Sequence, residues 1–192
     1  MGRKSRALER REEILAAFER CIVQYGLDVS LERVADVAGV QRSIIRHYIG
    51  NRDVVIEELI ERITHNYVAQ MSLTVQSIAD GEGLLDFLFS ADPTYADWEK
   101  IVVDILVSAQ ERFPQAKQRL TGMFQTLLAL LTQQLARLYP HAPPAHCEQI
   151  AYGLFCIATT NDTMTWIGFA PAATTGARSS AALLLATLAA HP

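Results

Sequence analysis

Cysteine is scarce in this chain of 192 residues, and so are long apolar runs. Cys21, Cys147 and Cys156 are an odd number and form no CxxC pair, which argues against a disulfide framework and favours free thiols in a reducing cytoplasm. The longest apolar runs, near 150–158 and 181–190, are too short to span a bilayer. No apolar stretch follows the first basic residues, so we expect no signal peptide and a cytoplasmic protein.

Motifs of common enzymes are also missing. The chain contains no GxSxG, P-loop or GxGxxG sequence. The residues that could ligate a metal lack a convincing spacing; they are His65, His141, His146, Cys147 and His191. His146 and Cys147 are adjacent, so a helix would point them about 100° apart. We therefore expect no enzyme activity, no metal site and no cofactor.

Alternating apolar and polar residues, the pattern of β-strands, are absent, whereas helical periodicity runs through the whole chain. Breakers at 79–83, 91–93 and 139–144 separate the later helices. The expected helices beyond residue 72 cover about 83–90, 95–112, 113–138, 144–168 and 174–189. The sequence therefore predicts an all-α fold.

The segment from Ser30 to Tyr48 carries the most specific pattern. Leu31, Val34, Ala35 and Ala38 share one face of a short helix for which Ser30 is a good N-cap. Gly39 follows where the chain must turn sharply. A second helix then buries Val40, Ile44, Ile45 and Tyr48. This spacing suits a DNA-binding helix-turn-helix, although an ordinary helical hairpin would show part of it.

The outward face of the second helix is polar and carries no acidic residue; it consists of Gln41, Arg42, Ser43, Arg46 and His47. Arg and Gln can read guanine and adenine edges in the major groove. We therefore expect Arg42 and Gln41 to read bases, with Ser43 as a smaller contact.

Charge is distributed unevenly along the chain. The formal net charge is −4 overall, but residues 1–52 hold ten Lys and Arg against seven Asp and Glu, whereas residues 53–192 hold seven against fourteen. A basic head on an acidic body attracts phosphate at one end. Arg3, Lys4 and Arg6 form a short basic arm before the first helix, which is either a phosphate or minor-groove contact or a solvated tail.

With its flanks, this head resembles the DNA-binding domain of the tetracycline-repressor (TetR) family of bacterial transcription regulators. The match runs from an amphipathic first helix, RREEILAAFERCIVQYG, through AGVQRSIIRHYIGNRDVV into a long fourth helix. The resemblance implies a three-helix DNA-binding domain over 1–52 that continues into a linking helix, 52–76. It also implies a helical effector-binding and dimerisation domain over 53–192.

The match departs from the family pattern at three positions. Arg46 replaces a Tyr that commonly touches a phosphate, Ile49 replaces a Phe, and Gln41 is a poorer helix cap than the usual Ser or Thr. We expect Arg46, His47, Tyr48 and Arg52 to hold phosphates. The predicted DNA-binding residues are Arg3, Lys4, Ser30, Gln41, Arg42, Ser43, Arg46, His47, Tyr48 and Arg52.

The last two helices are unusually apolar. Their shared faces are Ala151, Leu154, Ile157 and Ala158 in one, and Ala181, Ala182, Leu184, Leu185 and Leu188 in the other. An end this rich in Ala and Leu needs another surface to cover it, and the family resemblance implies a four-helix homodimer interface there. Burial within a monomer is the alternative.

A polar patch, Thr159–Thr163, interrupts the penultimate helix. Some of these groups must face inward, where they could bind an effector, bond across a dimer or cap a local break. The candidate effector-binding residues, each also explicable as plain core, are Trp98, Val102, Met123, Phe124, Leu127, Phe155, Thr159, Asn161 and Met164. Such walls suit a small lipophilic molecule.

Together these patterns predict a dimeric repressor that a small lipophilic effector releases from a palindromic DNA operator. Two other classes stay open. One is an effector-independent DNA-binding dimer controlled by a protein partner. The other is a helical ligand carrier or enzyme whose head no longer binds DNA.

Overall fold

The computed structural model describes residues 3–90 and 114–190 of the chain. In these two ranges every regular element is an α-helix, which confirms the predicted all-α fold class. The helices are α1 (Arg3–Tyr25), α2 (Leu31–Ala38), α3 (Arg42–Ile49), α4 (Arg52–Ser77), α5 (Gly81–Leu88), α7 (Pro114–Leu138), α8 (Pro144–Trp166) and α9 (Pro171–Ala189). The helix expected over 95–112 and the break at 91–93 lie outside the described residues.

Three helix starts differ from those expected. Helix α5 begins at Gly81 rather than 83, because the Asp80 side chain caps it by accepting a bond from the Gly83 N–H. The basic segment predicted to precede the first helix belongs to it, because α1 begins at Arg3. Residues 4–10 contain no Gly or Pro and are rich in strong helix formers, so nothing delays the helix. At the other end α9 begins at Pro171 rather than 174. Proline suits the first turn, since its missing N–H would have no helical partner there.

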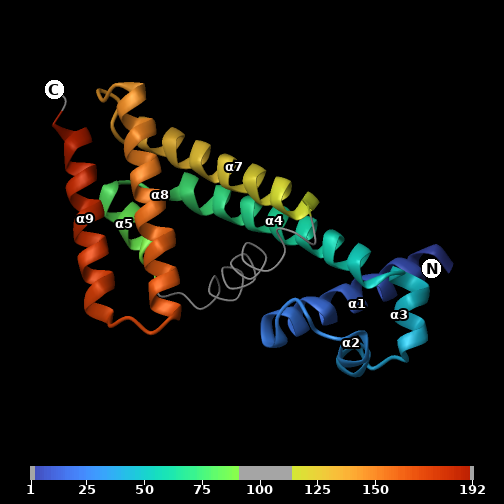
Figure 1. The fold of residues 1–192 in the computed structure, drawn as a ribbon. Coiled ribbons are helices and arrows are strands. Elements are labelled where there is room, and N and C mark those ends of the chain that lie inside the picture. The colour runs from blue at the N-terminus through green and yellow to red at the C-terminus, as the bar shows by residue number, and fades with distance from the viewer. Residues whose placement is uncertain (1–2, 91–113, 191–192) are drawn as a thin grey trace. The chain divides into compact units, whose positions relative to one another are not determined.

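The contacts divide the described residues into two compact units, 3–67 with 114–123, and 68–90 with 124–190. In the first unit α1, α2 and α3 lie beside the start of α4 (Figure 1), and the apolar side chains of these helices form a core. Its fully buried side chains include Ile14, Phe18, Val34, Ile45 and Ile56. These positions recur at helical spacing in each segment, so each helix presents one apolar face to the others.

Ion pairs join the helices of the first unit around this core. Arg11 of α1 makes two bonds to the carboxylate of Glu58 in α4. Arg119 of α7 pairs with Glu61 of α4 at 3.0 Å and also donates to the backbone carbonyl of Glu57. Because a charged pair forms only when both helices lie in register, these contacts help fix how α1 and α7 lie on α4.

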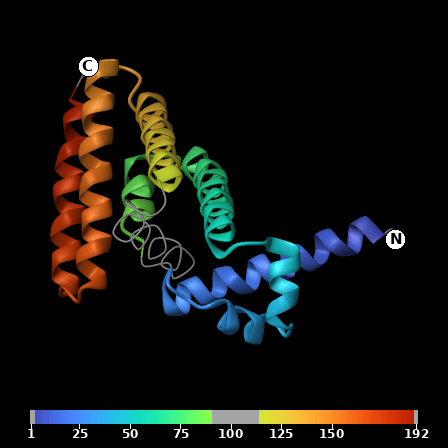
Figure 2. The ribbon, with the colours of Figure 1, turned by 45° about the vertical axis from the view of Figure 1, so that its right-hand side comes forward.

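The second unit has an apolar core shared by α5, α7, α8 and α9. Leu84, Leu135, Leu154 and Leu185, one from each helix, are almost completely buried in one cluster. Helices α8 and α9 run side by side along their length (Figures 1 and 2). Buried Gln134 donates to the carbonyl of Ile78, just beyond the end of α4, at 2.8 Å. This bond gives a backbone carbonyl a partner in a unit whose buried side chains are otherwise mainly apolar.

Candidate nucleic-acid interface

Local hydrogen bonds build the helix-turn-helix. The Ser30 side chain accepts a bond from the Arg33 N–H at 3.2 Å and caps α2, as expected. Gly39 ends α2 in the left-handed conformation, with φ of 64°. The next N–H, from Val40, donates to the Ala35 carbonyl at 3.0 Å. A residue with a side chain would be strained at this φ, so glycine makes the turn possible.

Helix α3 exposes the polar face that the periodicity predicted, which carries Gln41, Arg42, Ser43, Arg46 and His47. The predicted apolar face is only partly confirmed: Ile45 is buried, but Ile44 is half-buried and Ile49 is buried as well. Val40 is half-buried in the turn, because the helix begins only at Arg42. Gln41 occupies the N-cap position but its side chain makes no capping bond. Tyr48 is half-buried. The exposed polar face of a short helix preceded by a tight turn has the form needed to enter a major groove.

A depression of about 770 Å³ opens where α2, α3 and α4 begin or end near one another. It is lined by Asp28, Ser30, Leu31, Glu32, Arg42, Arg46, Gly50, Asn51 and Arg52. Four residues predicted to touch DNA therefore share one concave surface: Ser30, Arg42, Arg46 and Arg52. Gln41, Ser43, His47 and Tyr48 do not line it. Arg3 and Lys4 lie in the first turn of α1.

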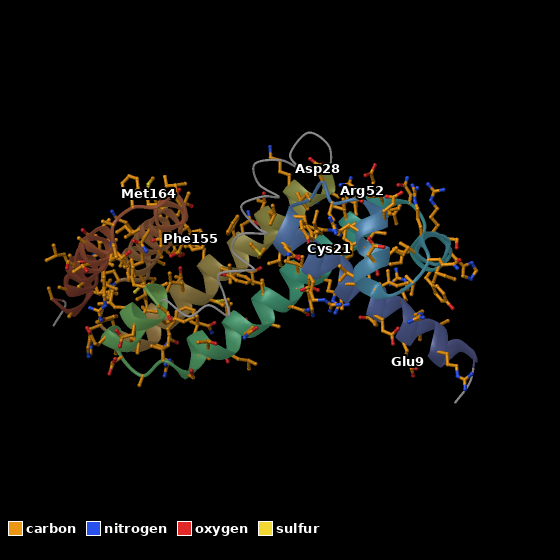
Figure 3. All side chains as sticks on the ribbon, turned by 90° about the horizontal axis from the view of Figure 1, so that it is seen from below. Glu9, Cys21, Asp28, Arg52, Phe155 and Met164 are labelled. Atoms are coloured by element: carbon orange, nitrogen blue, oxygen red, sulfur yellow. The ribbon has the colours of Figure 1, made fainter. Side chains whose placement is uncertain are left out.

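Arg52, which was predicted to hold a DNA phosphate, is mostly buried and bonded to the protein itself. Its side chain is only 19% exposed. It donates to the carbonyls of Leu27 and Val29, the latter at 3.3 Å, and lies 3.6 Å from Asp28 (Figure 3). Arg52 thus ties the start of α4 to the loop between α1 and α2. No local sequence pattern predicts these contacts, because the partners lie more than twenty residues apart.

The structure also brings two acidic residues to this surface that sequence reasoning did not include. Asp28 and Glu32 both line the depression, and Glu32 forms an ion pair with Arg42. An acidic residue in the first turn of α2 is the usual complement of a helix dipole, so the sequence offered no reason to connect it with α3.

The candidate effector residues are only partly brought together. Phe124 and Phe155 meet edge to face, with ring centroids 5.6 Å apart. Met123 is buried in the first unit, whereas Leu127 and Met164 are half-buried in the second. Figure 3 shows Phe155 and Met164 on α8. Trp98 and Val102 lie outside the described residues.

The residues of the polar patch in α8 differ in their burial and in their hydrogen bonds. Asn161 is buried, and its amide donates to the Asp162 carboxylate at 3.5 Å. Thr159 is exposed, and its hydroxyl donates a hydrogen bond to the Phe155 carbonyl at 2.8 Å. Burial raises the pKa of the Asp162 carboxyl to about 6, although the bond from Asn161 lowers it.

Within 3–90 and 114–190, His, Cys, Asp and Glu side chains form no group that could hold a metal ion. In those ranges, no helix combines the length and hydrophobicity needed to cross a bilayer.

Comparison with solved structures identifies the architecture. A TetR transcription regulator from Haloarcula marismortui superposes with a TM-score of 0.74 over 93% of this chain and 97% of its own, at 16% identity. The chain has the TetR fold. The reduced form of Escherichia coli NemR (TM-score 0.71, 17% identity, 90% and 95% covered) shares it. So does the fatty acid degradation regulator FadR from Bacillus halodurans (0.61, 18%, 95% and 97%).

No family model and no curated protein sequence matches the chain. The likeness of the whole chain to the TetR fold therefore rests on three-dimensional structure, whereas the motifs quoted above carry only the resemblance of the head.

Proposed function

We propose that this chain is a DNA-binding transcription regulator, not an enzyme, and that it acts in the cytoplasm as a homodimeric repressor. The observation that carries the proposal is the exposed polar face of α3, which stands behind a glycine turn in a TetR fold. DNA binding is assigned to residues 1–52, continuing into the helix 52–76, and effector binding and dimerisation to 53–192.

Arg42 and Gln41 are proposed to read bases, because they begin α3 and neither side chain is buried. Ser43 is proposed as a smaller base contact beside them. Arg46 and His47, also exposed, are proposed to contact phosphates together with Tyr48 and Arg52. Ser30, Arg3 and Lys4 are proposed as further DNA contacts. Arg52 has a second role, since it also holds the loop before α2. Its loss would therefore lower stability as well as affinity.

The apolar faces of α8 and α9 that the sequence analysis assigned to a dimer lie mostly in the unit's own core, where Ala151, Leu154, Ala181, Leu185 and Leu188 are buried, so burial within the monomer accounts for them. Dimerisation is therefore proposed to use the outer faces of the same two helices. Leu183 of α9 is 73% exposed and Tyr152 of α8 is 61% exposed. Large apolar side chains left in water on two adjacent helices favour a protein partner. A two-fold dimer would set two α3 helices about 34 Å apart and so match a palindrome. Leu183→Glu should give a monomer by sedimentation, whereas a dimer that survives would contradict this interface.

The effector is proposed to be small and lipophilic, and to bind the second unit. The half-buried Phe124, Phe155 and Met164 would supply adaptable apolar walls, and the buried Asn161 amide a polar anchor. An effector that binds the splayed dimer best would shift the population off DNA. A bound effector at about a hundred times its Kd should stabilise the protein by about 2.7 kcal/mol.

DNA binding is tested by selecting genomic fragments with the purified chain and measuring the affinity of variants. Arg42→Ala should cost about 1–3 kcal/mol on the selected duplex and relax its sequence preference. Arg46→Ala should weaken binding to all duplexes alike and reduce the salt slope by about one. Identical behaviour of both variants on selected and random duplexes would contradict these roles.

The same preparation separates the other functional classes. If no fragment is retarded even at low salt, the head does not bind DNA, and a ligand carrier becomes the better description. If fragments bind but a broad library of lipophilic compounds neither raises the melting temperature nor releases the DNA, an effector-independent regulator is favoured.

A further inference from the structure

Arg42, which is proposed to read a base, is paired with an acidic residue on the same surface. Its Nη1 forms an ion pair with Glu32 Oε1, which joins the first residue of α3 to the first turn of α2. The two side chains are 49% and 55% exposed. Both line the depression that also holds Arg46 and Ser30. An acidic group thus stands among residues proposed to approach phosphates.

The pair contributes little to folding. Ion pairs between half-exposed side chains gain modest Coulomb energy in water and lose side-chain entropy, so their effect on stability is usually small. The negative charge of Glu32 should also repel every DNA phosphate nearby, whatever the sequence. Neither stability nor general affinity therefore accounts for an acidic residue at this position.

Sequence specificity does account for an acidic residue at the position of Glu32. A guanidinium has five N–H donors, and a carboxylate that engages one nitrogen leaves others available for the O6 and N7 acceptors of guanine. An arginine already held in one orientation loses less rotamer freedom when it binds. The repulsion of phosphate lowers binding to all sequences, while the orientation favours the sequence that Arg42 reads.

We infer that Glu32 is a positioning residue for base readout, which holds the Arg42 guanidinium toward a guanine edge and so sets the preference at one base pair. The inference rests on the proposed DNA-binding function. It adds to that function a residue on α2, outside the recognition helix, that acts on sequence preference through Arg42.

The test uses the full chain and the duplex selected by the wild type. The base pair read by Arg42 is first located as the position where Arg42→Ala loses its preference for guanine. Glu32→Gln, which keeps the length but removes the charge, is then compared with the wild type on duplexes that carry guanine or adenine at that position. Asp28→Asn is the matched control, because Asp28 lines the same depression but pairs with Arg52.

Both substitutions should raise affinity for random duplexes, since each removes one negative charge near phosphates. Glu32→Gln alone should lower the guanine preference, by roughly five- to tenfold, a part of what a good bidentate contact provides. At the other base pairs of the selected duplex, Glu32→Gln should keep the wild-type preferences. That result would separate positioning through Arg42 from a purely structural effect, which would weaken the preferences at all positions.

The inference is overturned if Glu32→Gln keeps the wild-type preference and merely tightens binding as Asp28→Asn does. It is also overturned if Glu32→Gln weakens the preferences at all base pairs of the duplex alike. In both cases the wild type still selects a sequence, so the proposed function stands. A wild type that binds no duplex would overturn the proposed function and this inference together.

Discussion

The two units of this chain are held together differently. The first packs its helices around an apolar core and also joins them with ion pairs, such as Arg11–Glu58 and Arg62–Glu12. The second is held mainly by an apolar cluster that α5, α7, α8 and α9 share, and α9 carries a single charged residue, Arg178. Charge pairs specify how two helices meet, whereas apolar faces associate with less geometric demand. The contrast suits the roles proposed for the two units, DNA recognition for the first and the binding of a partner and an effector for the second.

Removing a core side chain in one unit should produce the largest effect and test whether the units are energetically separate. Phe18→Ala, in the fully buried core of the first unit, should cost about 3–5 kcal/mol. Leu154→Ala should cost the second about 2–5 kcal/mol. Hydrogen exchange should show lost protection mainly in the unit that carries the change.

Leu8→Ala, at an exposed position of α1, is the control and should change stability by no more than about 0.5 kcal/mol. If both core variants lose protection evenly across the chain, the molecule unfolds as one cooperative unit and the comparison fails.

An intermediate effect is expected at Asp162, a half-buried carboxylate in the mainly apolar second unit. Because its folded pKa of about 6 lies above the usual value, the folded state disfavours the charged form. Asp162→Asn should therefore stabilise the chain above about pH 6, by about 1–2 kcal/mol after allowance for partial solvation. The gain should shrink as pH falls and vanish below about pH 4, where the carboxyl is neutral in both states.

Thermal unfolding of both proteins between pH 4 and 8 measures this difference. Asp36→Asn is a matched control, because it makes the same chemical change on an exposed side chain of the first unit. A constant difference across this range would show that Asp162 is not desolvated in the fold.

The smallest effect concerns the ion pairs themselves. A double-mutant cycle of Arg11→Met and Glu58→Gln should give a coupling of about 0.5–1 kcal/mol that weakens at high salt. Arg178→Met with Glu82→Gln, in the second unit, should give no measurable coupling. The reason is exposure: the Glu58 side chain is 29% exposed and the Glu82 side chain 69%. Equal couplings in the two cycles would remove this part of the contrast.

The sequence-based prediction was correct for features that depend on local interactions. The cap at Ser30, the turn at Gly39 and the outward face of α3 each depend on residues within a few positions, and all three are observed. It erred at the start of α1, where the basic residues were separated from a helix that they join. There a charge pattern was given more weight than helix propensity.

The amino-acid sequence by itself determined the helices, their apolar faces and the glycine turn that presents α3, because caps, propensity and periodicity act over a few residues. Only the tertiary structure decided that Glu32 meets Arg42, that Arg52 holds the loop at Leu27 and Val29, and that Phe124 meets Phe155. These contacts join segments that are distant in sequence, or two helices across a turn. They depend on how helices cross, which the packing of a whole unit sets and no local pattern records.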